Sequence, residues 1–542
     1  MTAESSEKDR GDDPALGSNS SSLYNQHRHE EIPSVRLALL SLGLSTGLFL
    51  SFLDSSIVAT SLFTIGTEFD CIERVNWVAL AYTLSYLGCA VFVARISDVI
   101  GRRNAFLISY TIFIAFSLGC GFAQNLQQLI AFRAIQGLGG SVIILPEIAP
   151  PRLLQALAAV IGIIITLSSV LGPVLGGILT HYASWRWIFW INGPIGAASF
   201  LLFFMTWPKP KYLPNLERRS WRELDYFGSS LLIAAAVLIV FPFQNAGSAT
   251  DQWGQAIFLA PLIVGLIAFL GVFAWSLFVD RRWGDKIAAA LPMSLLRDRV
   301  YASAVLNTMF LGFPYILIIY AFPLRCQVVN GRDALLAGIM LLPMLGSSAV
   351  GSAISGKVNG KEDRSCETLV VATSFMVLGC GLLTTVSGSV GLEPKALGFL
   401  VFVGLGFGLS VSTTTMLAAL RSSIRDHAPA QGIVAQVRVF GGSLGIAASS
   451  AILGVSLHTQ VGGSVTSQQI ASVEGDGANL APSELAAIRR AYADAFREDM
   501  RVCTIIAGVA LLWALGTYKQ QVRQEIERRK VVAAGEGPQQ EM

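Results

Sequence analysis

The chain alternates long apolar runs with short polar segments. A bilayer core of about 30 Å requires roughly 20 apolar residues per helix, so we marked each run of about 17 or more residues that charged or turn residues bound. Fourteen runs qualify, and they begin near Leu37, Trp77, Ala105, Leu129, Gln155, Trp187, Asp225, Ala256, Tyr301, Ala334, Thr368, Ala396, Gln431 and Val502. Backbone groups in lipid must be satisfied within their own segment, so each run is predicted to be a helix. The pattern predicts an all-α integral membrane protein.

Composition excludes a soluble fold. Of the 542 residues, 53% are hydrophobic and only 14% are charged, about half the usual charged share. A water-soluble protein cannot cover that much apolar surface. The net charge of +3 gives no indication of nucleic-acid binding. The cysteine and histidine residues show no metal-ligand spacing, so we expect no metal, no cofactor and no disulfide framework.

Lysine and arginine residues orient the helices. When the N-terminus is placed inside, the inner segments hold more of the 39 Lys and Arg residues than the outer loops, by roughly three to one. Both termini are therefore predicted to be cytoplasmic. Residues 1–36 are polar and rich in serine, which predicts a disordered cytoplasmic tail.

The inner loop between the second and third runs reads ARISDVIGRRN, beginning at Ala94. Gly101 permits the turn, and Asp98 is placed to pair with a neighbouring helix end. Arg102 and Arg103 would anchor the loop at the lipid headgroups. Anchoring alone explains the two arginines but not the acid and the glycine before them.

Two charged residues lie inside apolar runs of the N-terminal half. Asp54 is the only acid of the first run, and burial disfavours a charged carboxylate, as a proton carrier at neutral pH requires. Our hypothesis is that Asp54 binds and releases a proton; the alternative is a hydrogen bond between helices. Arg133, in the fourth run, should face the bundle interior and meet an acid, a carbonyl or water. Its role is either in transport or in a structural pair.

The fifth run contains SSVLGPVLGGIL, which includes Gly172, Pro173, Gly176 and Gly177. Glycine and proline in one helix permit a kink and the close approach of a neighbour, which suits a helix that changes its packing. One glycine would be ordinary in a membrane helix, but the whole spacing is not.

These motifs resemble those of the major facilitator superfamily. The inner loop is similar to the pattern G-x-x-x-D-x-x-G-R-R/K, with Ala94 in place of its first glycine. The segment holding Arg133 and Gln136 is similar to the superfamily's second motif. The fifth run is similar to the antiporter motif of its exporters, with Ser168 in place of the leading glycine. The run holding Asp54 is similar to the first helix of fourteen-helix drug:proton antiporters.

The resemblance implies a major facilitator fold: two six-helix bundles plus two inserted helices, with a substrate site between the halves at mid-membrane. It implies that Asp54 and Arg133 take part in proton coupling and that Gln136 and Arg438 lie near the pathway. The expected segments are a cytoplasmic tail 1–36, a bundle 37–206, a linker 207–224, the inserted pair 225–279, an inner loop 280–300, a second bundle 301–518 with an outer loop 457–501, and a tail 519–542.

The function that the resemblance implies is proton-coupled efflux of small apolar molecules, such as a toxin, drug or secondary metabolite, by alternating access. Sparse embedded charge favours neutral or weakly acidic cargo. We expect a monomer in the plasma membrane, with the vacuolar membrane as the alternative. A carrier of another solute, such as a basic amino acid or a siderophore, would share the fold; a receptor or channel is less favoured, and an enzyme least.

Two glycine-rich segments imitate nucleotide-binding loops. GSAISGKV, from Gly351, has Val358 where a phosphate-binding loop needs a hydroxyl for magnesium. GLGFG, from Gly404, lacks the full dinucleotide pattern and lies inside the twelfth run, which favours close packing of helices. The expected partners are therefore a small-molecule substrate, protons and the bilayer, without a nucleotide.

Two segments depart from a simple succession of spans. The fourth run ends before Pro146 after about 17 residues, so either the helix is short and thins the bilayer or the sequence has lost a segment. Glu147, just beyond, is then either a loop acid or an acid near the pathway. In the outer loop, apolar residues recur at helical spacing after Ser483, which predicts an amphipathic surface helix or a substrate lid. Those residues are Leu485, Ile488, Tyr492 and Phe496.

Overall fold

The computed structural model describes most of the apolar runs and many of their connections. The described residues are 33–71, 74–140, 154–208, 220–246, 254–283, 287, 289, 291–359, 364–388, 391, 393–422, 427–461 and 482–518. Within these ranges every regular element is a helix. The all-α class is confirmed.

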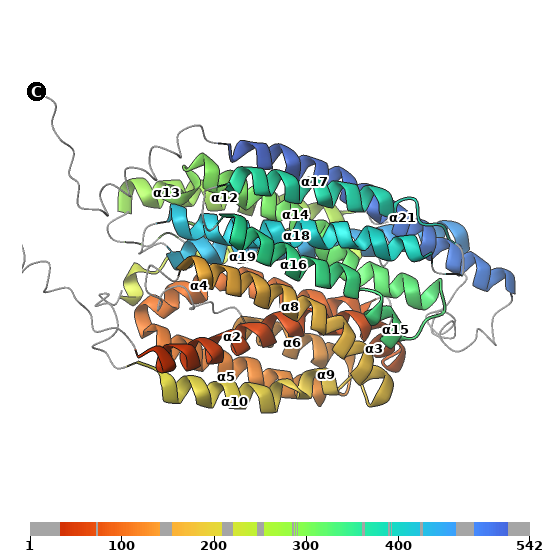
Figure 1. Ribbon diagram of the computed structural model, residues 1–542, viewed down its shortest axis with the longest axis horizontal. Coiled ribbons are helices and arrows are strands. Elements are labelled where there is room, and N and C mark those ends of the chain that lie inside the picture. Colours follow the sequence, from red (N-terminus) through yellow and green to blue (C-terminus); the bar gives the residue numbers. More distant parts are fainter. Residues whose placement is uncertain are drawn as a thin grey trace, which may run out of the picture.

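The N-terminal helices lie side by side in the lower part of Figure 1. They are α2 (Ser34–Ile57), η1 (Val58–Thr60), α3 (Leu62–Glu68), α4 (Asn76–Ile100), α5 (Arg102–Gly121), α6 (Leu126–Gly140), α8 (Leu154–Tyr182), α9 (Trp187–Trp190) and α10 (Asn192–Thr206). Aromatic side chains fill the space between α5 and α10, where the rings of Phe106 and Phe203 lie 4.2 Å apart. Such ring pairs supply much of the packing energy of the bundle.

Most of the C-terminal helices form the upper part of Figure 1. The full set is α13 (Met293–Leu296), α14 (Arg299–Val328), α15 (Ala334–Ile339), α16 (Leu342–Asn359), α17 (Ser365–Leu383), α18 (Pro394–Arg421), α19 (His427–Val461) and α21 (Pro482–Gly516). Of these, α15 lies lower, near α8. In α14 and α18, 67% of the most apolar 18-residue stretch is buried. These two helices therefore form the centre of the half.

The inserted pair, α11 (Tyr226–Ala246) and α12 (Ala256–Trp283), follows the short η5 (Trp221–Glu223). α11 packs against both α4 and α19, where Leu84, Val240 and Ile446 share one apolar cluster. α12 contacts mainly α11, and only 22% of its apolar stretch is buried. Leucine and isoleucine side chains exposed along α12 find a favourable solvent in lipid and not in water.

Twelve helices among the described residues are long and apolar enough to cross a membrane. The second and fourth predicted spans correspond to α4, with 25 residues, and to the shorter α6, with 15. A multi-pass membrane protein is thereby confirmed, and a total of fourteen spans is compatible with these helices but stays a prediction. The residue boundaries of the two bundles also stay predictions.

Several predictions about segments fall outside the described residues. These segments include most of both tails, the linker from 209 to 219 and residues 462–481. Residues 141–153 belong to the same set, so the short fourth span is described only to Gly140. Pro146 and Glu147 lie beyond that point, and the predictions made for them stay open.

The prediction that the helix of the last outer loop lies on the surface was wrong. The helical spacing is confirmed, but the segment is the first part of α21, which runs without interruption from Pro482 to Gly516. Its apolar face, with Ile488 and Tyr492, packs against Val328 at the end of α14. The helical spacing of the apolar residues identified the apolar face of the helix, but it could not show which part of the protein covers that face.

The GLGFG segment is a site of close helix packing, as its position in an apolar run indicated. A Cβ atom added to Gly404 would meet the carbonyl oxygen of Met344, and one added to Gly408 would meet that of Ser348. α18 therefore lies directly on the backbone of α16. Only glycine permits this approach.

We predict that Gly408→Ala lowers the melting temperature of the purified protein in detergent. The added methyl group meets backbone atoms that cannot move alone, and such overpacking typically costs about 1–3 kcal/mol. Gly398→Ala is the matched control, because a Cβ at Gly398, in the same helix, has nothing within 4 Å. Equal melting temperatures for the two variants would contradict the close approach.

Candidate functional site

A buried ion pair joins two helices of the N-terminal half. The guanidinium of Arg133, on α6, donates a short hydrogen bond to the carboxylate of Asp54, on α2. Both side chains are 0% exposed. Arg133 also donates to the carbonyl oxygen of Val78 at 3.1 Å. The expectation that Arg133 meets an acid and a carbonyl inside the bundle is confirmed, whereas its role in transport stays a prediction.

Two amide side chains complete the shell of Asp54. Gln136, one turn after Arg133, donates to Asp54 Oδ1 at 3.0 Å. Asn192, the first residue of α10, donates to the same oxygen at 2.9 Å and to the hydroxyl of Ser117, on α5, at 2.9 Å. The carboxylate therefore accepts hydrogen bonds from α6 and α10, and the network reaches α5.

Aromatic rings enclose the guanidinium. Its carbon lies 4.4 Å from the centre of the Tyr82 ring and 5.5 Å from that of Phe189. A cation over an aromatic face is attracted by the ring's electrons, and the attraction grows when water is excluded. The hydroxyl of Tyr82 in turn donates to the carbonyl oxygen of Ser51 at 2.9 Å. The pair is thus fully enclosed by polar partners and aromatic rings, with no exposed surface.

Glycines let α6 come close enough to place Arg133 there. A Cβ at Gly137 would meet the carbonyl oxygen of Tyr82 on α4, and one at Gly139 would meet backbone atoms of Ser109 and Phe113 on α5. α6 therefore fits between α4 and α5. The Gln-Gly-x-Gly sequence after Arg133 permits this close approach to α4 and α5.

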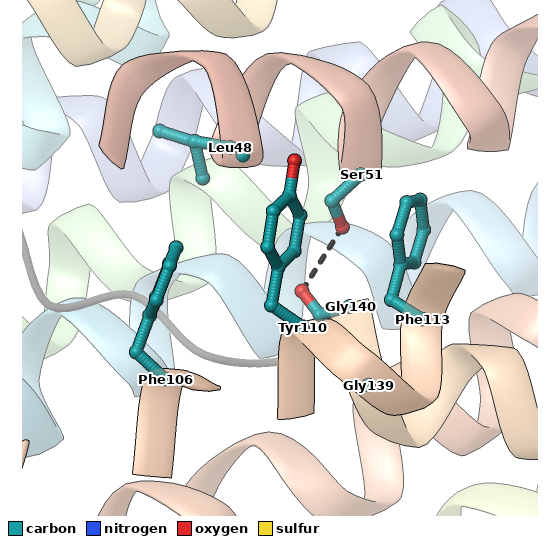
Figure 2. A pocket seen from close by; sticks show the side chains of 8 residues that line it. Leu48, Ser51, Phe106, Tyr110, Phe113, Gly139 and Gly140 are labelled. Carbon is teal, nitrogen blue, oxygen red and sulfur yellow. Dashed lines mark hydrogen bonds between the residues drawn. The ribbon is translucent and has the colours of Figure 1, made fainter. Parts of the chain in front are cut away.

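A small pocket opens beside the pair, between α2, α5 and α6. In Figure 2 the ring of Tyr110 stands between Phe106 and Phe113 and points toward α2. The Tyr110 hydroxyl is buried and has no hydrogen-bond partner among the described residues. Ser51, on the opposite wall, donates to the carbonyl oxygen of Gly140 at 2.9 Å.

The antiporter-like segment of α8 contacts both halves of the protein. A Cβ at Gly172 would meet Ser56 on α2, and one at Gly177 would meet the backbone of Ala334 on α15. Thr60 donates to the carbonyl oxygen of Pro173 at 3.2 Å. α8 is therefore a backbone-to-backbone junction between the N-terminal helices and the C-terminal half. Gly176 continues the contact, since a Cβ there would meet the backbone of Ile57, at the end of α2, and the hydroxyl of Thr60 in η1.

The inner loop motif is compact and lies apart from the ion pair. Gly101 ends α4 with φ of 89°, a conformation that favours glycine, so the predicted turn is confirmed. Arg102 donates a short hydrogen bond to Ser97, and the guanidinium of Arg103 lies 5.0 Å from the centre of the Phe204 ring. The side chain of Asp98 is outside the described set, so its predicted pairing stays untested.

Arg438, on α19, is buried but has no acid within hydrogen-bonding distance among the described residues. Its Nε donates to the hydroxyl of Thr308, on α14, at 3.3 Å, and its Nη2 has no partner. Nearby, the Gln436 amide donates to the carbonyl oxygen of Leu87, on α4. Arg438 therefore lies where the two halves meet, away from the Asp54 cluster.

Two buried charges were missed because their positions were assigned to outer loops. Asp499 lies in α21 and accepts a hydrogen bond from Ser449, on α19, at 2.7 Å. Arg325, near the end of α14, donates to the carbonyl oxygen of Ser387 at 2.6 Å. The bundles therefore hold more embedded charge than the sequence analysis expected. Asn192 was also missed, because an asparagine at a helix start is typical of a cap.

The arrangement defines a class of protein. Membrane-crossing helices in two halves, joined through a helix of small residues and enclosing a buried ion pair, are the architecture of a membrane transporter. The structure of a bacterial homologue of the human lysosomal transporter Spinster has the same fold, with a TM-score of 0.57 at 14% identity, over 89% of this chain and 97% of that one.

Sequence comparison gives the family. Residues 44–250 match the model of the Major Facilitator Superfamily. The chain is 31% identical to the MFS-type transporter FPY5 of Fusarium mangiferae, over 90% of this chain and 84% of that protein. It is 30% identical to Multidrug resistance protein 3 of Bacillus subtilis, over 75% of this chain and 77% of that protein. The chain belongs to the major facilitator superfamily and is a transporter, not an enzyme.

The ion pair predicts a specific pattern of stability. Arg133→Gln leaves the carboxylate of Asp54 buried without a cation, and removing one partner of a buried pair typically costs about 3–5 kcal/mol. Asp54→Asn leaves the opposite charge unpaired. The double variant removes both charges, so its melting temperature at pH 8 should lie closer to that of the parent than either single variant does. Additive losses in the double variant would contradict the pairing.

Proposed function

We propose that this chain is a proton-coupled exporter of small, largely apolar molecules, in which Asp54 binds the proton and Arg133 responds to it. The observation that carries the proposal is the fully buried Asp54–Arg133 pair with its two amide donors. The names of similar proteins support export as the direction, since they include the efflux pump dotC of Dothistroma septosporum, 29% identical over 74% of this chain and 68% of that protein.

Protonation of Asp54 would act on the packing of four helices. A neutral carboxyl group no longer balances the charge of Arg133, and an unpaired buried charge is costly. The proton therefore disfavours the arrangement of α2, α5, α6 and α10 in which the pair is sealed. It favours any arrangement in which Arg133 meets water or another acceptor. A ligand that binds one arrangement better than another shifts the population between them.

The pair lies toward the predicted outer side of the membrane. Arg133 is about 10 Å along α6 from the first residue of that helix, Leu126, which the orientation places outside. The outer ends of the halves are joined, because Asn76, on α4, donates to Ser450, on α19, at 2.7 Å. Separation of these ends would open a route for protons from outside to Asp54.

The α8 junction supplies a surface on which the halves can move. Pro173 presents its carbonyl oxygen to the position where a Cβ on Gly338 would lie, and Gly177 faces Ala334 in the same way. Where two helices contact each other through backbone atoms at glycines, few interlocked side chains have to separate before the helices move. Alternating access by rocking of two bundles requires a contact of this kind.

The proposal also covers the oligomeric state, the membrane, the grouping of the helices and the cargo. We propose a monomer in the plasma membrane, with the helices grouped as residues 37–206, an inserted pair 225–279 and residues 301–518. The cargo is a toxin, drug or secondary metabolite. α11 bridges α4 and α19, so the inserted pair flanks the junction between the halves without interrupting it.

We predict that Asp54→Asn abolishes accumulation driven by an imposed pH gradient in proteoliposomes, while exchange of cargo at equal pH continues. The amide cannot carry a proton but preserves the size of the side chain. A panel of apolar fluorescent compounds serves as cargo, with accumulation and exchange measured on the same vesicles.

Asp225→Asn is the matched control for that experiment. Asp225 is also a buried acid, but it caps α11 through the backbone N–H of Gly228 at 2.7 Å and accepts from Trp275 at 2.8 Å. Its amide variant should retain coupling. Gradient-driven accumulation by Asp54→Asn at the parent's level would overturn the assignment of the proton site, and a current without saturable flux would indicate a channel.

A further inference from the structure

Arg438 is a buried cation whose charge the described residues leave unbalanced. Its side chain is 4% exposed, and its one hydrogen bond is to the neutral hydroxyl of Thr308. Nη2 is buried without a partner. An arginine in this position is costly, whereas Arg133, equally embedded, has a carboxylate. A cost of this kind persists where a ligand supplies the missing charge.

A second unsatisfied group lies beside it, across the contact between the halves. Tyr86, on α4, is buried, and its hydroxyl has no hydrogen-bond partner in the part of the chain that the structure describes. Gln436, two residues before Arg438, donates to the carbonyl oxygen of Leu87, the residue after Tyr86, so Arg438 and Tyr86 belong to helix segments in direct contact. One oxygen atom with two lone pairs could accept from the arginine and from the tyrosine at the same time. A carboxylate offers such an oxygen.

The site has an apolar side as well. The ring of Phe52, on α2, packs edge-to-face against Tyr86 with centres 6.2 Å apart, and Tyr82 stacks on Tyr86 at 6.4 Å. α2, α4, α14 and α19 therefore meet at one cation, the hydroxyls of Tyr86 and Thr308, and several aromatic faces. A molecule with an apolar or aromatic body and one acidic group matches that combination.

Depth in the membrane excludes a lipid headgroup as the source of the anion. Arg438 lies about 16 Å along α19 from its inner end at His427, and Tyr86 about 15 Å along α4 from its outer end at Asn76. Both values correspond to the middle of a bilayer core of about 30 Å. A headgroup phosphate resides at the surface, whereas a transported molecule passes through the middle.

We infer that Arg438 and Tyr86 form the recognition site for an acidic group on the cargo, so that the exporter prefers organic anions, apolar molecules bearing a carboxylate, to their neutral derivatives. This inference rests on the proposed export function and names its substrate class. The polar contacts on either side of the site hold the halves together around it. They are Gln436 with Leu87, and Ser443 with Thr83 at 3.2 Å.

The test is equilibrium binding of acids and their methyl esters to the purified full-length protein. The probes are 1-pyrenebutyrate, 2-naphthaleneacetate and decanoate, each paired with its ester. A charge-assisted contact should give the parent protein a preference of about tenfold or more for the acid in at least one pair. Arg438→Met should remove the preference, Arg438→Lys should keep part of it, and Tyr86→Phe should reduce it. No preference in any pair, or a preference that survives Arg438→Met, would overturn the inference.

Stability without any ligand provides an independent measurement. An unbalanced cation destabilises the empty protein, so Arg438→Met should have a melting temperature at or above that of the parent. Arg133→Gln is the contrasting variant, because that arginine is paired and its loss should lower the melting temperature. A comparable decrease in both variants would show that Arg438 has a structural counter-charge, which contradicts a site reserved for cargo.

The outcomes separate this inference from the proposed function. If binding is acid-selective and requires Arg438, but flux does not depend on the pH gradient, the proposal of proton coupling is contradicted and the recognition site is supported. If export is driven by the pH gradient but binding shows no preference for acids, the recognition site is contradicted and proton coupling is supported. Asp54→Asn should retain acid-selective binding, since Arg438 keeps its charge and, among the described residues, the two sites share only the ring of Tyr82.

Discussion

The requirement that a charge inside a membrane be balanced organises this structure. Asp54 and Arg133 balance each other's charge within one bundle. Their arrangement depends on several helices at once, because Gln136 and Asn192 also bind the carboxylate. α6 reaches the required depth only through its glycines. The hydrogen bonds of the pair therefore link the packing of α2, α5, α6 and α10, and α4 joins them through the carbonyl oxygen of Val78.

Arg133 and Arg438 meet this requirement in opposite ways. Arg133 is neutralised by the protein, which makes it sensitive to a proton on its partner. Arg438 has only a hydroxyl, which leaves its charge available to a molecule that enters between the halves. The first arrangement suits energy coupling and the second suits recognition. Arg133 lies inside the N-terminal half and Arg438 at the contact between the halves, and the ring of Tyr82 packs against both sites.

Sequence patterns predicted some of these features for physical reasons. Lipid leaves an arginine few acceptors, so the kind of partner that Arg133 finds could be expected, and the spacing of Gly404 and its neighbours indicated close packing. The contribution of Asn192 could not be expected, because it depends on a contact between residues 138 apart in the chain. The location of α21 was misjudged because an amphipathic period identifies an apolar face without showing whether lipid surface or protein covers it. Asp499 was missed for the same reason.

Small energies suffice to move such a molecule between states. The junction of α8 with α15 consists of backbone contacts at Gly177 and Gly338, so sliding there separates few interlocked side chains. The difference between conformations then depends on a limited number of polar contacts, including Asn76 with Ser450 and the buried ion pair. A ligand shifts a two-state equilibrium only by its difference in affinity for the states, and a few kcal/mol changes a population by orders of magnitude. A single proton at Asp54, by removing the balance of one buried charge, is of the right magnitude to do this.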